Sequence, residues 1–77
     1  MSHSERNIII TGAGSGIGAA AARAFSESGD RVHLFDLSQE RLDDVAAQLK
    51  TVKTYQVDVT DAQRIRETIE SIEKEVS

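Results

Sequence analysis

The sequence contains no cysteine and no proline among its 77 residues. Disulfide bonds are therefore excluded, and the two histidines, His3 and His33, stand too far apart in the sequence to suggest a metal site. A chain of this length buries only about 60% of the surface that its unfolded form exposes, so without such staples we expect marginal stability. The absence of cysteine fits a reducing compartment.

Long apolar runs and basic clusters are absent as well. No stretch approaches the roughly 18 apolar residues of a membrane span, and the opening MSHSERN lacks the apolar core of a signal peptide. Nine basic residues stand against thirteen acidic ones, a net charge of −4. This balance argues against a nucleic-acid partner, because neutralising phosphates requires a basic patch. We therefore expect a cytoplasmic protein that binds neither nucleic acid nor a membrane.

Hydrophobic periodicity divides the chain into alternating strands and helices. Short β-branched runs predict strands over 7–11, 31–36 and 54–59, and the first of them, NIIIT, is typical of a strand buried on both faces. An alanine-rich stretch predicts a helix over 17–28, with Gly29 at its C-terminal cap.

Two further helices are predicted from caps and apolar stripes. Ser38 is expected to cap a helix over 39–50, and Thr60 with Gln63 matches a capping box before a last helix. The stripes consist of Leu42, Val45, Ala46 and Leu49 in the first helix and of Ala62, Ile65, Ile69, Ile72 and Val76 in the second. The order β-α-β-α-β-α predicts an α/β fold, namely half of a Rossmann-type doubly wound parallel sheet with strand order 3-2-1.

Four of the five glycines fall within seven residues, in IIITGAGSGIG, between the first predicted strand and the first helix. A helix N-terminus offers unsatisfied N–H groups and a partial positive charge, and glycines there let a diphosphate approach the backbone closely. The spacing is not that of a P-loop, because no Gly-Lys-Ser/Thr follows, and it does not fit G-x-G-x-x-G. A purely structural turn is the alternative, and Gly14 could serve loop flexibility alone.

The glycines fit Thr-Gly-x-x-x-Gly-x-Gly, present as TGAGSGIG, which closely resembles the cofactor loop of the short-chain dehydrogenase/reductase family. The resemblance implies a nicotinamide dinucleotide as cofactor, and the residue choices at Ser15 and Asp36 favour NAD over NADP. The loop residues it assigns to cofactor binding are Gly12, Ser15, Gly16, Ile17 and Gly18. Ser15 stands where relatives that prefer NADP often carry a basic residue, although its hydroxyl could also bond within the loop.

Two acidic positions further along the chain agree with this resemblance. Asp36, the last residue of the second predicted strand, could accept hydrogen bonds from the adenosine ribose and would repel the extra phosphate of NADP. Leu37 follows it in place of a basic residue. In VDVTD, Asp58 and Val59 correspond to the family's adenine contacts. The alternatives are structural: Asp36 could cap the next helix, and Asp58 could be a turn residue.

The resemblance covers only the first part of the family's domain. We expect residues 1–77 to be the N-terminal part of a dinucleotide-binding domain, without the catalytic serine and the Tyr-x-x-x-Lys pair of the family. Val59, not lysine, stands four residues after Tyr55, so no catalytic residue is predicted. The parent chain would be an NAD(H)-dependent alcohol/carbonyl oxidoreductase, and these residues alone would be inactive.

The first strand is central in the order 3-2-1-4-5-6, so without a fourth strand it becomes an apolar edge. Such an edge is a template for pairing, and we expect a homo-oligomer through residues 7–11. A non-catalytic nucleotide-binding module and a merely oligomerising one are the alternatives to the dehydrogenase interpretation.

Overall fold

The computed structural model describes residues 6–76, in which three parallel strands alternate with three helices. The elements are β1 (Asn7–Thr11), α1 (Gly16–Glu27), β2 (Arg31–Asp36), α2 (Gln39–Ala46), β3 (Val52–Gln56) and α3 (Ala62–Val76). β2 lies between β1 and β3, which confirms the predicted α/β class and the strand order 3-2-1. His3 lies outside the described residues.

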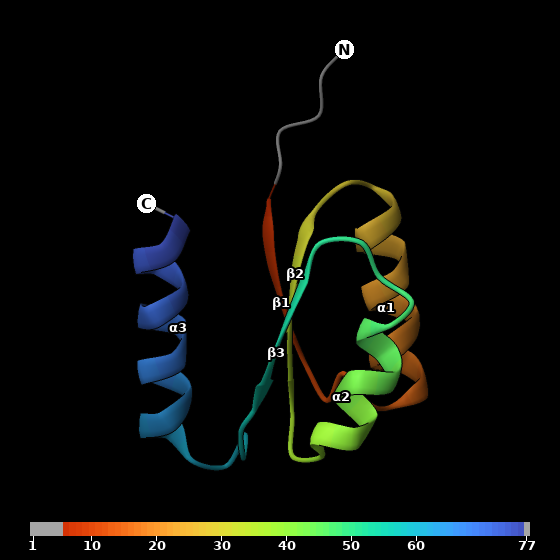
Figure 1. Ribbon diagram of the computed structural model, residues 1–77. Helices are drawn as coiled ribbons and strands as arrows, with labels where there is room; N and C mark the ends of the chain where they lie inside the picture. Colours follow the sequence, from red (N-terminus) through yellow and green to blue (C-terminus); the bar gives the residue numbers. More distant parts are fainter. Residues whose placement is uncertain (1–5, 77) are drawn as a thin grey trace.

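The helices cover the sheet from both sides. α1 and α2 lie on one face and α3 lies on the other (Figure 1). Successive side chains of a strand point to opposite faces, so Val32 and Leu34 pack under α1 and α2 while Phe35 packs against α3. Four consecutive residues of β2 are buried, as expected for a strand that is covered on both faces.

The two faces carry cores of unequal size. The core under α1 and α2 contains Ala13, Ala22, Val32, Leu34, Leu42 and Val45, and the core under α3 contains Phe35, Val57 and Ile72. Ile65 and Ile69 pack against the smaller core, but Ala62 and Val76 are exposed, so the buried stripe of α3 is narrower than predicted. None of the helices within residues 6–76 is long and apolar enough to cross a membrane.

β1 is the least covered strand. Ile8 and Ile10 are half-buried, and Ile9 is 37% exposed, so the prediction of burial on both faces is wrong. The physical reason is its place in the sheet: within the described residues, β1 pairs with β2 alone. The structure thus confirms the expected apolar sheet edge at residues 7–11.

α1 begins one residue earlier than predicted and ends in a Schellman motif. Gly29 has a φ of 90°, a left-handed conformation that glycine adopts without steric cost. Its N–H donates to the Ser26 carbonyl at 3.0 Å, and the N–H of Asp30 donates to the Phe25 carbonyl at 3.1 Å. The glycine therefore turns the chain from α1 into β2, as the sequence predicted.

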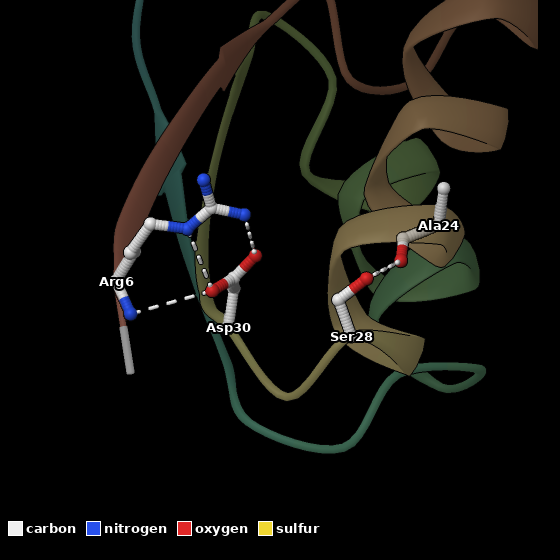
Figure 2. A network of polar contacts seen from close by, with 4 residues as sticks. All are labelled: Arg6, Ala24, Ser28 and Asp30. Carbon is white, nitrogen blue, oxygen red and sulfur yellow. Dashed lines mark hydrogen bonds and ion pairs between the residues drawn. The ribbon is translucent and has the colours of Figure 1, made fainter. Parts of the chain in front are cut away.

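Asp30 fastens the amino ends of β1 and β2 to each other. Its buried carboxylate accepts from the backbone N–H of Arg6 at 3.3 Å. It also accepts from Nε and Nη2 of the Arg6 side chain, at 3.2 and 2.9 Å (Figure 2). This contact raises the pKa of the Arg6 guanidinium. Ser28 donates from its hydroxyl to the Ala24 carbonyl at 3.2 Å and secures the last turn of α1 (Figure 2).

α2 is shorter than the predicted helix over 39–50. Ser38 caps it as expected, with its hydroxyl accepting from the backbone N–H of Arg41 at 3.2 Å. The helix ends at Ala46, and the N–H groups of Gln48 and Leu49 donate to the carbonyls three residues earlier at 3.0 Å. The N–H of Lys50 then donates to the hydroxyl of Ser26 in α1 at 3.1 Å. The predicted residues 47–50 therefore form a tighter turn and a contact with α1 in place of a further turn of α2.

β3 occupies Val52–Gln56 in place of the predicted 54–59. Its register explains both ends: Val52 lies opposite Val32, and Gln56 lies opposite Asp36, where β2 ends. Without a partner strand beyond Asp36, the chain leaves the sheet after Gln56.

The predicted capping box at the start of α3 is also wrong. Asp61, not Thr60, supplies the cap, because its Oδ1 accepts from the backbone N–H of Arg64 at 3.1 Å. The hydroxyl of Thr60 donates instead to Asp58 at 2.7 Å, and the side chain of Gln63 donates to Glu67. The cap therefore lies one residue further along the chain than the pattern indicated.

His33 connects the three strands on the face that carries α3. Its Nε2 lies 3.0 Å from the Oδ1 of Asn7 in β1, and its Nδ1 lies 3.2 Å from the hydroxyl of Tyr55 in β3. An amide oxygen only accepts, so Nε2 carries the proton and Nδ1 accepts from the hydroxyl. His33 is buried, and this burial lowers its pKa. His33 is therefore part of the packed sheet.

We predict that the free energy of unfolding decreases as the pH falls from 7.5 to 5.5. The pKa of His33 is lower in the folded chain than the value of about 6.5 in the unfolded chain. The contribution of neutral His33 to stability is therefore complete at a pH above its pKa in the unfolded chain. It is lost as the pH falls and His33 of the unfolded chain takes up a proton, by at most about 1.4 kcal/mol per pH unit. Glu75 opposes this shift, whereas Lys53 and Arg31 add to it.

Urea unfolding at several pH values measures this dependence. The control is His33→Gln, which retains polar atoms but does not titrate. A variant with the same slope as the wild-type chain would show that another group is responsible.

Candidate functional site

The glycine loop joins β1 to α1 at the carboxyl edge of the sheet, and it is held together by its own backbone. Gly12 has a φ of 65°, which makes the turn. Its carbonyl accepts from the N–H of Ser15 at 3.0 Å and from the hydroxyl of Ser15 at 2.8 Å. Ala13 is buried, and its N–H donates to the Phe35 carbonyl at 3.2 Å, which ties the loop to β2.

Ser15 is the N-cap of α1. Its hydroxyl oxygen accepts from the N–H of Gly18 at 3.1 Å while the hydroxyl donates to Gly12. The hydroxyl thus both donates and accepts a hydrogen bond within the loop. This is the structural alternative that the sequence left open for Ser15. Its part in cofactor binding stays a prediction.

Each of the other three loop glycines has a different environment. A Cβ at Gly18 would overlap the carbonyl oxygen of Gly12, so the close packing of α1 on the loop requires glycine there. A Cβ at Gly14 would overlap the Asp36 carboxylate, so Gly14 does more than provide flexibility. A Cβ at Gly16 would meet no protein atom within 4 Å, and Gly16 has no positive φ. The protein itself therefore gives no reason for glycine at position 16.

The first turn of α1 offers free donors beside this open space. The N–H of Gly18 is satisfied by the Ser15 hydroxyl and that of Ala19 by the Ser15 carbonyl. Within residues 6–76, the N–H groups of Gly16 and Ile17 donate to no protein acceptor, as is usual at a helix start. No acidic side chain lies in this turn to compete for them. The arrangement can accept an anion.

Asp36, at the end of β2, points at the glycine loop. Its Oδ2 accepts from the N–H of Gly14 at 2.6 Å, and its Oδ1 accepts from the N–H of Leu37 at 2.6 Å. A carboxylate has about four lone-pair sites, so each oxygen keeps capacity for a further donor. The structure thus places Asp36, the residue predicted to bind the ribose, against the loop predicted to bind phosphate.

The segment after β3 lies beside the end of β2. The N–H of Val57 donates to the carbonyl of Asp36 at 2.9 Å, and the side chain of Gln56 donates to the carbonyl of Leu37 at 3.0 Å. Asp58 follows directly. Its Oδ1 accepts from the backbone and the hydroxyl of Thr60, which lowers the pKa of Asp58. Asp58 is therefore a turn residue in this structure, and both hydrogen bonds from Thr60 use the same oxygen.

Exposed apolar side chains accompany these polar groups. Ile17 is 88% exposed, Leu37 is 58% exposed and Val59 is 51% exposed. Each is a predicted cofactor-binding residue next to a glycine or an aspartate of the site. Of the predicted set, Gly12, Ser15, Gly16, Gly18, Asp36 and Leu37 lie around the glycine loop, while Asp58 and Val59 lie after the neighbouring strand.

A cavity of about 150 Å³ lies at the other end of the sheet. Its lining includes His33, Lys53 and Glu75, and none of the predicted site residues. We place the candidate site at the carboxyl edge nevertheless, because ligands of open α/β sheets bind outside the carboxyl ends of the strands. The free amides and the Asp36 carboxylate lie there, whereas the polar atoms of His33 are already paired.

Three parallel strands with a glycine loop after the first and an aspartate at the end of the second define one mononucleotide-binding half of a doubly wound fold. Comparison with known proteins gives the family. Residues 6–77 match the family described as short chain dehydrogenase. The chain therefore belongs to the short-chain dehydrogenase family of oxidoreductases, as its motifs suggested.

Among its relatives is the NAD-dependent glycerol dehydrogenase of Listeria innocua, 43% identical over 68 residues, a match that spans 86% of this chain and 26% of that protein. A putative D-mannonate oxidoreductase from Haemophilus influenza, solved with bound NAD, shares 30% identity with a TM-score of 0.82 over 91% of this chain and 26% of its own. An NAD+-bound xylitol dehydrogenase shares 28% identity with a TM-score of 0.85 over 91% and 28%. The chain thus spans about a quarter of the length of these proteins.

We predict opposite effects on stability for alanine at Gly18 and at Gly16. Gly18→Ala should lower the free energy of unfolding by about 1–3 kcal/mol, because its Cβ overlaps backbone. Gly16→Ala should leave it unchanged or raise it by up to about 1 kcal/mol, because the position is helical and open. Chemical unfolding of both variants measures the difference, and equal losses would contradict the assigned packing.

Proposed function

We propose that this chain binds the adenosine and diphosphate part of NAD(H). We further propose that residues 1–77 form the N-terminal part of the dinucleotide-binding domain of a longer oxidoreductase, which transfers a hydride between NAD and an alcohol or carbonyl substrate. The observation that carries the proposal is the open space at Gly16 beside the free N–H groups of α1, in a loop whose Gly14 N–H binds the Asp36 carboxylate. In such an enzyme the nicotinamide ring of NAD carries the hydride.

The diphosphate would be held by backbone groups. The N–H groups of Gly16 and Ile17 are available, and the positive end of the α1 dipole favours an anion. Gly12 and Gly18 act on the shape of the loop, through the turn and the close helix packing respectively. Ser15 fixes the loop from inside through its hydroxyl.

The adenosine would lie along the ends of β2 and β3. Asp36 would accept hydrogen bonds from the ribose hydroxyls, and the apolar Leu37 beside it offers no cation to a 2′-phosphate. Asp58 and Val59 would contact the adenine. These assignments support NAD over NADP, in line with the names of the relatives that bind or depend on NAD.

We expect no hydride transfer from these residues alone. Tyr55 is the only tyrosine of the sequence, and its hydroxyl forms a hydrogen bond with His33 of β2. The absence of a nucleic-acid partner and the cytoplasmic location stay predictions from composition.

Titration calorimetry with NAD, NADP and AMP tests the proposal. We expect weak binding of NAD and AMP, and Asp36→Ala should weaken NAD by roughly tenfold or more, since hydrogen bonds to a charged group contribute about 1.5–3 kcal/mol. The affinity for NADP should change little, so the preference for NAD narrows. Asp44→Ala, which removes an exposed carboxylate of α2 away from the site, is the charge-matched control. An unchanged preference in Asp36→Ala would refute the ribose assignment.

A second proposal concerns self-association. Within residues 6–76, β1 presents an uncharged, proline-free edge, and Ile9 at its centre is 37% exposed. Natural sheets usually blunt such edges with charge, proline or a covering element. We infer that two copies of this 77-residue chain by itself, with no further strand beside β1, pair through residues 7–11 about a two-fold axis, which would make a continuous six-stranded sheet.

Sedimentation velocity over a concentration series tests this pairing. Ile9→Lys should shift the chain to a monomer, because a charged side chain in the edge strand opposes pairing. Val76→Lys adds the same charge at an apolar residue of α3 that is 41% exposed, and it should leave the association unchanged. A wild-type chain that stays monomeric at every concentration would rule the dimer out.

A further inference from the structure

Gly14 and Asp36 make a contact that ribose binding by itself does not require. The backbone N–H of Gly14 donates to Oδ2 of Asp36 at 2.6 Å, across 22 positions of sequence. The N–H of Leu37 donates to Oδ1 at 2.6 Å. Both oxygens of the carboxylate are therefore fixed by backbone donors, one of which belongs to the glycine loop.

The same contact leaves no room for a side chain at position 14. A Cβ there would overlap Oδ2 of Asp36 and would lie 2.7 Å from the Cβ and 3.0 Å from the Cδ of Arg41. The Cβ of Arg41 is attached directly to the α2 backbone and cannot swing away. The Asp36 carboxylate can rotate out of the way, but the overlap with the Cβ of Arg41 is relieved only if the loop or the α2 backbone shifts as well.

We propose that Gly14 is a positioning residue for the Asp36 carboxylate and thereby sets the preference of the site for a ribose without a 2′-phosphate. This inference rests on the proposed function. While Gly14 holds Oδ2, the carboxylate stays at the loop, where its remaining lone pairs can accept from ribose hydroxyls and its charge opposes a phosphate. A side chain at position 14 would displace the carboxylate, so both effects would weaken together.

The hydrogen bond itself is testable without any ligand. Amide hydrogen exchange by NMR should show Gly14 protected in the wild-type chain and at least about tenfold less protected in Asp36→Ala, as loss of a charge-assisted bond implies. Asp44→Ala should leave that amide unchanged. A Gly14 amide that exchanges equally fast in the wild-type chain and in Asp36→Ala would overturn the proposal. This measurement needs no substitution at position 14, so it decides the point even if Gly14→Ala does not fold.

The consequence for selectivity is measured by calorimetry with NAD and NADP. In folded Gly14→Ala, checked by circular dichroism, the ratio of NAD to NADP affinity should fall roughly tenfold or more. Gly16→Ala should weaken both dinucleotides by similar factors, because they share the diphosphate. If Gly14→Ala only distorted the loop, it would weaken NAD and NADP equally and leave the ratio of their affinities unchanged.

A double-mutant cycle shows whether Gly14 acts through Asp36. The double variant Gly14→Ala/Asp36→Ala should have the same affinity ratio as Asp36→Ala alone, since the carboxylate that Gly14 positions is already gone. Additive changes in the ratio, or an unchanged ratio in Gly14→Ala, would overturn the proposal while NAD binding stands. If the wild-type chain binds neither dinucleotide, the proposed function and the selectivity fail together, even with a protected Gly14 amide.

Discussion

The close approach of α1 to the end of β1 is the constraint on which both the fold and the site depend. Gly18, in the first turn of α1, lies so near the Gly12 carbonyl that no side chain fits between them. The same carbonyl accepts from the N–H and the hydroxyl of Ser15. The loop is thus closed by its own hydrogen bonds, and the amides of Gly16 and Ile17 remain outside that network. A bulkier residue at position 18 would overlap the backbone of Gly12 and Ala13, so either the helix start or the loop would have to shift.

The two ends of the sheet carry different kinds of polar contact. At the amino end, the buried carboxylate of Asp30 is held by several donors of Arg6, which joins elements that are distant in sequence. At the carboxyl end, Asp36 accepts from the backbone N–H groups of Gly14 and Leu37, and Asp58 accepts from Thr60 with one oxygen. The amino end is therefore built for cohesion, whereas the carboxyl end keeps hydrogen-bonding capacity for a ligand.

Local pattern predicted those features that local physics decides. The bounds of β2 agree residue for residue, because a buried apolar run there is bracketed by Arg31 and Asp36. The bounds of β3 were missed because they depend on the partner strand, and the end of α2 was missed because its apolar stripe continues to Leu49 through a turn with i→i−3 bonds that the periodicity does not distinguish from helix. The same distinction holds in the site. Glycine spacing predicted the loop, but the role of Gly14 depends on a side chain 22 positions away, which no local pattern contains.

A chain with a net charge of −4 would bind a diphosphate poorly if the total side-chain charge decided the affinity. In the structure, the acidic side chains are kept apart from the helix start that can accept an anion. The first turn of α1 contains no acidic residue, whereas that of α2 contains Glu40. A helix start attracts an anion through its N–H groups and its dipole, and this attraction acts only within the first turn. The negative charge of Asp36 lies instead at the end of β2, where it would meet a sugar. Attraction for the diphosphate and repulsion of a further phosphate can therefore coexist at one sheet edge, because the backbone supplies the first and a side chain supplies the second.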